Sequence, residues 1–111
     1  MKETGYFEKK KDSGKTRWDL VPWEEVEPLA EILTFGAEKY GDNTWQTLPD
    51  GPKRYKAVLF RHLVAWCKGE KLDPESGLPH LAHAMCNIVF LMHLEKRDEK
   101  KNDFFSEVTK K

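Results

Sequence analysis

The chain has 111 residues, enough for one small domain with one core and too few for a second. Its 19 Lys and Arg residues balance its 19 Asp and Glu residues, so no overall basic field attracts nucleic acid. No stretch approaches the roughly 18 apolar residues of a membrane span, and the charged N-terminus lacks the apolar run of a signal peptide. We therefore expect a cytoplasmic protein that binds neither nucleic acid nor membranes.

The N-terminal segment divides into two parts. Residues 1–14 are charged and carry no periodic apolar pattern, which predicts a flexible arm. Residues 15–23 alternate cations with large apolar groups, which predicts an extended segment lying on the body of the domain. Two interpretations of Lys15 and Arg17 stay open: incidental charges of a docked arm, or groups that bind phosphate.

The first helix is predicted between Pro22 and Gly41, because acidic residues follow the proline and apolar residues then recur at helical spacing. Pro28 interrupts this pattern early, so we expect either a short turn followed by a main helix from Pro28, or one kinked helix. Gly41 is expected to end the helix in the left-handed conformation. An acidic stripe on this helix is either a solvated face or a set of carboxylates directed at a site. The stripe consists of Glu27, Glu31, Thr34 and Glu38.

The loop of residues 41–51 is rich in turn-forming residues and carries Trp45 in its middle. An aromatic side chain on such a loop serves either as a lid over the core or as a platform on which a nucleobase stacks. Asp50 is expected to cap a second helix, which ends near Lys68. A third helix is expected to stay apolar to about Leu94, where a charged run ends the packed structure.

The polar residues that we expect to lie closest together in space are those at the bend between the second and third helices. His62 lies on the second helix, Glu70 and Asp73 lie in the turn, and His80 and His83 begin the third helix. Titratable groups at both ends of a short turn can converge on one point, as a metal-assisted site requires. On the third helix, helical spacing separates a polar face from an apolar face. The polar face comprises His80, His83 and Asn87, and the apolar face comprises Leu81, Met85, Ile88 and Met92.

Metal-assisted chemistry is the scheme that fits these residues. The sequence lacks a phosphate loop, a G-x-S-x-G elbow and a dinucleotide fingerprint. Cys67 and Cys86 lie inside predicted helices without metal-finger spacing, which favours reduced, mostly buried thiols over a disulfide or a nucleophile. Carboxylates favour magnesium or manganese, whereas imidazoles also suit zinc, manganese or cobalt. The spacing leaves the choice of metal open.

Four sequence words occur in order: GKTRWDLVPW, LTFGAEKYGDNTW, RHLVAWCKGEKLDPESGLPHLAHA and NIVFLMHLE. Together they resemble the dATP/dGTP diphosphohydrolase N-terminal domain family, common in phages and related to the all-α MazG-like nucleotide pyrophosphohydrolases. The resemblance spans about Gly14 to Glu95. It implies a small α-helical, commonly oligomeric domain. Such a domain cleaves a purine deoxynucleoside triphosphate into a monophosphate and pyrophosphate, using magnesium or a similar ion.

The resemblance also implies where metal would bind. MazG-like enzymes usually hold metal through E-x-x-E on one helix and E-x-x-D on the next. In this chain His80-x-x-His83 stands where E-x-x-D is expected, so the site is a histidine-rich substitute. Two further alternatives follow for such a site: hydrolysis of a different substrate, or binding of a nucleotide or metal without hydrolysis.

These observations lead to one set of predictions. The fold is all-α, a small bundle of about three main helices with a helical hairpin carrying the site, in a domain of residues 15–96 followed by a charged tail, 97–111. The function is metal-dependent hydrolysis of dATP and dGTP by a homo-oligomer, with Mg²⁺ foremost and Mn²⁺ or Co²⁺ as alternatives. The rival functions are a non-catalytic nucleotide- or metal-binding module and a helical interaction protein.

Each role is assigned to named residues. Catalytic roles are predicted for His62, Glu70, Asp73, His80 and His83. Metal ligation is predicted for Glu38, Glu70, Asp73, His80 and His83. Substrate binding is predicted for Lys15, Arg17, Lys39, Asn43, Trp45, Arg54 and Arg61.

Overall fold

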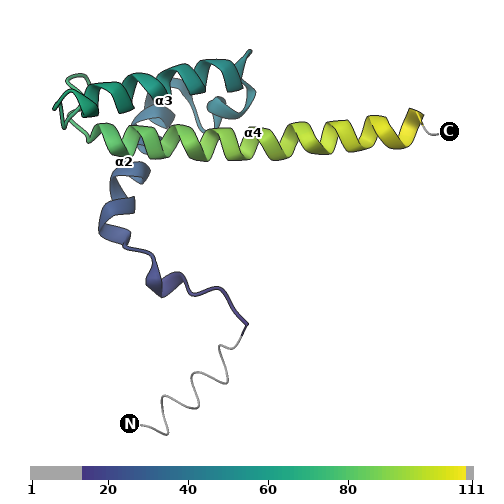
Figure 1. Ribbon diagram of the computed structural model, residues 1–111, viewed down its shortest axis with the longest axis horizontal. Helices are drawn as coiled ribbons and strands as arrows, with labels where there is room; N and C mark the ends of the chain where they lie inside the picture. Colours follow the sequence, from purple (N-terminus) through teal and green to yellow (C-terminus); the bar gives the residue numbers. More distant parts are fainter. Residues whose placement is uncertain (1–13, 110–111) are drawn as a thin grey trace, which may run out of the picture.

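The fold is an arrangement of three main helices (Figure 1). The computed structural model describes the backbone of residues 14–109 and the side chains of residues 14–100. No strand forms within residues 14–109, so the predicted all-α class is confirmed. The elements are η1 (Trp18–Leu20), α2 (Trp23–Tyr40), η2 (Thr44–Thr47), α3 (Gly51–Cys67) and α4 (His80–Thr109).

Helix α4 is the element against which the others pack. It contacts both α2 and α3, and α3 and α4 form an antiparallel pair joined by residues 68–79 (Figure 1). The buried apolar side chains of the described residues all lie on α4. They point in several directions around its axis because α2 and α3 cover different sides. These residues are Ala82, Ala84, Cys86 and Leu94.

The assignment of polar and apolar faces on α4 was wrong in one respect. His80 and Asn87 of the polar face are buried, whereas Ile88 and Met92 of the apolar face are 46% and 56% exposed. The buried polar groups are hydrogen-bonded: the Asn87 amide, for example, donates to the carbonyl of His83 (2.8 Å). The face of α4 that packs inside the molecule is therefore partly polar.

Helix α2 is continuous from Trp23 to Tyr40 and contains Pro28, which confirms the single-helix alternative. Pro28 is the sixth residue of this helix, where its missing N–H leaves the Glu24 carbonyl without its usual helical partner. The helix ends before Gly41 as predicted, and the Gly41 N–H donates to the carbonyl of Ala37 (2.8 Å). The predicted left-handed helical cap is wrong, because Gly41 has φ 100° and ψ 158°. This extended conformation with positive φ favours glycine.

Helix α3 begins where the sequence predicted, with a proline in its first turn. Asp50 does not cap it through its side chain. A capping residue needs an extended backbone, whereas Asp50 is left-handed, with φ 56° and ψ 31°. Gly51 is buried, and a Cβ atom there would lie 3.1 Å from Leu94 Cδ1. The start of α3 therefore approaches α4 closely.

Trp45 lies against α4, as the lid interpretation predicted. Its ring stacks on Phe90 with centroids 4.3 Å apart and meets His93 edge-on at 5.0 Å. The Tyr55 hydroxyl donates a hydrogen bond to the Trp45 carbonyl (2.8 Å). Phe90 therefore covers a face of the Trp45 ring on which a base would otherwise stack.

The third helix extends beyond the predicted end near Leu94. α4 continues to Thr109, because residues 95–101 are Glu, Lys, Arg and Asp without a glycine or proline to stop the helix. Packing also continues, since Arg97 Nη1 donates to the carbonyl of Gln46 in η2 (2.9 Å). The predicted arm, 1–14, lies outside the described residues except for Gly14.

The segment before α2 does not lie on the body of the domain as predicted. Trp18 and Leu20 are 66% and 69% exposed, and the segment extends away from α3 and α4 (Figure 1). Trp18 instead stacks on Trp23 with ring centroids 6.4 Å apart, and Trp23 Nε1 donates to the Trp18 carbonyl (3.2 Å). The aromatic residues of this segment therefore contact one another rather than the core.

The two cysteines differ in exposure. Cys67 is exposed at the end of α3, so its predicted burial was wrong, whereas Cys86 is buried. Burial raises the pKa of the Cys86 thiol to about 12, which keeps it protonated and unreactive at neutral pH.

A substitution at Leu94 tests the packing around α4, because this side chain is 1% exposed and lies close to Gly51 at the start of α3. We expect Leu94→Ala to lower the free energy of unfolding by about 2–5 kcal/mol, since it leaves a cavity. The same substitution at Leu72, which is 54% exposed, should cost less than about 1 kcal/mol. Urea denaturation followed by circular dichroism measures both, and equal losses would contradict the central role of α4.

Candidate active site

The loop of residues 68–79 holds the site together. Two backbone hydrogen bonds close it: the Asp73 N–H donates to the Leu78 carbonyl (2.8 Å), and the His80 N–H donates to the Lys71 carbonyl (2.9 Å). The Ser76 N–H donates to Asp73 Oδ2 (2.9 Å), a local bond typical of Asp in turns. The loop thereby places the Asp73 carboxylate beside the first turn of α4.

A chain of hydrogen bonds links α3, α4 and the loop through His80. His80 Nε2 lies 2.7 Å from Glu70 Oε1, and His80 Nδ1 lies 2.8 Å from His62 Nδ1. A carboxylate only accepts, so His80 Nε2 carries the proton and donates to Glu70. His80 Nδ1 therefore faces His62, and the two Nδ1 atoms share one proton.

The ring of His83 packs against that of His62. The two rings are parallel, with centroids 4.5 Å apart and an interplanar angle of 8°. His83 Nε2 lies 2.7 Å from Ser76 Oγ and 3.8 Å from Asp73 Oδ2. The Ser76 hydroxyl oxygen also accepts a hydrogen bond from the Leu78 N–H (3.1 Å), which fixes its position.

Burial and hydrogen bonding set the protonation states of the cluster. Burial lowers the pKa of His62, and the neighbouring His83 and His80 lower it further. Burial likewise lowers the pKa of His83. For Asp73 burial opposes ionisation, but hydrogen bonds from Ser76 outweigh it and lower the pKa. Neutral imidazoles and an ionised carboxylate are the states that metal ligands require.

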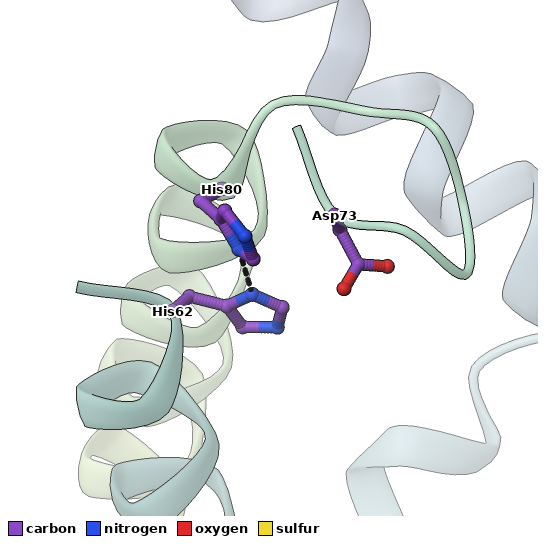
Figure 2. Close-up of side chains that lie close together, drawn as sticks. All are labelled: His62, Asp73 and His80. Carbon is purple, nitrogen blue, oxygen red and sulfur yellow. Dashed lines mark hydrogen bonds between the residues drawn. The ribbon is translucent and has the colours of Figure 1, made fainter. Parts of the chain in front are cut away.

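Three of these side chains have the geometry of a metal site. His62, Asp73 and His80 each offer one ligand atom, and these atoms lie within 4.8 Å of one another (Figure 2). Two imidazole nitrogens and one carboxylate oxygen suit zinc, manganese or cobalt, whereas magnesium prefers oxygen ligands alone. Three protein ligands leave positions for water and substrate. Glu70, which accepts from the far nitrogen of His80, orients that ring in the manner of a carboxylate behind a metal-bound histidine.

The structure brings together all five residues predicted for catalysis. Glu70 and His83, however, are not among the three possible metal ligands. Glu70 accepts a hydrogen bond from His80, and the His83 ring stacks on that of His62. Lys39, at the end of α2, lies beside the loop, with its Nζ 3.9 Å from Glu75 Oε1. The five residues are His62, Glu70, Asp73, His80 and His83.

Arg54 and Arg17 were predicted for the site but lie on other parts of the chain. Arg54 is the fourth residue of α3, eight residues before His62, or about 12 Å along a helix axis. Arg17 pairs with Asp19 at 2.7 Å in the segment before α2. Among the described residues no hydrogen bond or ion pair links the remaining four to the cluster. These four are Lys15, Glu38, Asn43 and Trp45.

An open hollow lies on α3, and Glu70 is its one lining residue that bonds to the cluster. The hollow has a volume of about 600 Å³ and is lined by the apolar Phe60 and Val64 and by the cations Arg61 and Lys68. The Glu70 carboxylate accepts a hydrogen bond from His80.

Sequence reasoning missed two residues, Ser76 and Lys68. Ser76 follows Asp73 by three residues, and this spacing in a turn is a signal for a local hydrogen bond that could have drawn attention to it. Lys68 carried no comparable signal, because a lysine at the end of a helix is common.

Residues 7–104 match the family described as dATP/dGTP diphosphohydrolase, N-terminal. The chain belongs to this family. Over 83 residues it is 34% identical to a protein of Salmonella phage PMBT28 named dATP/dGTP diphosphohydrolase. The aligned part covers 75% of this chain but 28% of that protein, so the chain spans less than a third of its relative. No solved structure matches.

The family match confirms the resemblance inferred from the four sequence words, and it covers every residue of the histidine cluster. The relation to MazG-like enzymes stays a prediction. No helix within residues 14–109 combines the length and apolar character needed to cross a membrane.

The lowered histidine pKa values make the metal-free domain sensitive to acid. The ordinary pKa is 6.5, and folding lowers that of His62 and His83. Below this pH the unfolded chain binds protons that the folded domain excludes, so the free energy of unfolding should fall as the pH drops below 6.5. Urea denaturation in a chelator at several pH values measures the fall.

A matched pair of variants assigns this pH dependence. His62→Gln should make the fall in stability smaller, whereas His93→Gln, at an exposed position near Trp45, should leave it unchanged. The same pH dependence in both variants would contradict the role of the cluster.

Proposed function

We propose that this domain hydrolyses purine deoxynucleoside triphosphates, dATP and dGTP, to the monophosphate and pyrophosphate in a metal-dependent reaction. The observation that carries the proposal is the meeting of His62, Asp73 and His80, whose ligand atoms lie within 4.8 Å of one another. Family membership supports the choice of substrate, since the matched family and the phage relative are both described as dATP/dGTP diphosphohydrolases.

The donor atoms favour a divalent transition metal. His62 and His80 supply imidazole nitrogens with Asp73 as the oxygen ligand, a set that suits manganese, cobalt or zinc better than magnesium. A cation held there would neutralise phosphate oxygens and lower the pKa of a bound water. Glu70 keeps His80 in the tautomer and orientation that ligation needs.

The remaining polar side chains divide the other tasks. His83 is neutral, lies 3.8 Å from Asp73 Oδ2 and stands outside the ligand group, so it is placed to accept a proton from the attacking water. Ser76 holds the His83 ring by its 2.7 Å contact. Arg61, which precedes His62 in the sequence, is the predicted phosphate-binding cation nearest the cluster.

The bonding changes are those of a hydrolysis. The water oxygen forms a bond to the α phosphorus, and the bond from that phosphorus to the oxygen bridging the α and β phosphates breaks. Pyrophosphate leaves with that oxygen, and a cation held by the site would stabilise its charge. A screen of the common deoxynucleoside triphosphates against magnesium, manganese and cobalt, with pyrophosphate and phosphate measured separately, tests the proposal. A triphosphate-dependent rise in melting temperature without any pyrophosphate would instead indicate a binding module.

Removing a ligand should abolish turnover. We expect His80→Ala and Asp73→Ala each to reduce pyrophosphate release by roughly 100-fold or more, because each removes a ligand atom from the site. The matched variant His93→Ala, far along α4 from the cluster, should keep wild-type activity. Circular dichroism should show unchanged helical content in all three. Pyrophosphate release retained by both site variants would remove the hairpin from consideration.

Glu70 should act on the metal only through His80. We expect Glu70→Gln to weaken Mn²⁺ binding by about 10–100-fold, because the amide holds the His80 ring less firmly than the carboxylate. Glu75→Gln is the control, since Glu75 lies in the same loop with a side chain 78% exposed. Isothermal titration with Mn²⁺ measures both variants. Equal affinities would show that Glu70 does not orient the site.

A further inference from the structure

Helices α2 and α3 each turn one face away from α4, and these two faces carry opposite charge. Helical spacing groups the outward residues on each helix, and all of them are exposed. The acidic face of α2 consists of Glu24, Glu27, Glu31, Thr34, Phe35 and Glu38. The basic face of α3 consists of Lys53, Lys56, Ala57, Phe60, Arg61, Val64 and Lys68.

Each face combines a ring of charge with an exposed aromatic side chain. Phe35 on the acidic face is 50% exposed, and Phe60 on the basic face is 55% exposed. Val64, beside Phe60, is also 50% exposed. Apolar groups surrounded by polar ones on a surface are typical of a protein–protein contact.

The two faces do not meet within one chain. α4 contacts both helices on their other sides, and no ion pair of the described residues joins the acidic face to the basic face. The chain is also extended, with a radius of gyration of 19.2 Å against about 13 Å for a compact domain of 100 residues. A single copy therefore leaves both faces without a partner.

We propose that the acidic face of one copy binds the basic face of a second copy. The charges are opposite in sign, with four carboxylates on the acidic face and three lysines besides Arg61 on the basic face. A two-fold axis repeats the contact, because α2 of the second copy then meets α3 of the first and both pairs of faces are covered at once. The proposal rests on the fold and the charges, and not on the proposed function.

Assembly of this kind would also cover the open hollow on α3. Phe60 and Val64 line that hollow and belong to the basic face, so a helix seated there would close its open side.

Paired charge reversals test which faces meet. Wild-type protein at micromolar concentration should sediment as a dimer, and added salt should weaken the dimer. Glu27→Lys with Glu31→Lys places cations against cations, and Lys53→Glu with Lys56→Glu places acids against acids. Each double variant should raise the dissociation constant by roughly 30-fold, because the two-fold axis repeats every altered pair. An equimolar mixture of the two should restore a dimer, since their faces are again complementary.

Matched controls use charges on α4 outside both faces. Glu95→Lys with Glu99→Lys, and Lys96→Glu with Lys100→Glu, change the same charges at exposed positions and should leave the dimer intact. Circular dichroism confirms that every variant is folded. His80→Ala should remain a dimer, so failure of this proposal and failure of the proposed function are distinguishable.

Three results would overturn the pairing of these faces. The first is a monomeric wild-type chain. The second is a dimer that neither double reversal weakens. Dissociation of that dimer by Ile88→Asp would place the contact on the outer side of α4 instead, where Ile88 is 46% exposed. The third is a mixture of the two double variants that stays monomeric.

Discussion

The pairing of a buried imidazole is the constraint on which the geometry of the candidate site depends. His80 is 3% exposed at the first position of α4, and an imidazole there must find partners for its ring nitrogens or pay the cost of desolvation. It finds Glu70 on one side and His62 on the other, while its backbone N–H bonds to the loop. The end of α3, the loop and the start of α4 are thereby held in one arrangement.

That constraint explains why polar chemistry gathers at one end of the α3–α4 pair and apolar packing at the other. Near the bend the side chains between the helices are His62, His80 and His83, which contact one another and the loop. Farther along α4, Leu94 meets the start of α3 and Trp45 covers Phe90. A lowered histidine pKa follows from the same burial, so the features that position the cluster also keep its nitrogens available.

The helices themselves were accessible from local signals. Proline near a helix start and glycine after its end act through one or two residues, so the limits of α2 and the start of α3 could be predicted. The errors concern interactions that local signals do not carry. The charged run after Leu94 was taken as the end of packing, although Arg97 reaches the carbonyl of Gln46, 51 residues earlier in the chain. Asp50 had the composition of a cap but not the backbone conformation.

The sequence alone determined the class of the fold, the family and the convergence of two histidine-bearing helices on an acidic turn, because helical period and short loops constrain these features locally. Only the tertiary structure decided which atoms meet. It separated the possible ligands His62, Asp73 and His80 from the supporting Glu70 and His83, because ring orientation depends on hydrogen bonds between elements. It also placed Trp45 and Arg54 away from the cluster, because the position of a loop or helix start follows from packing over the whole chain.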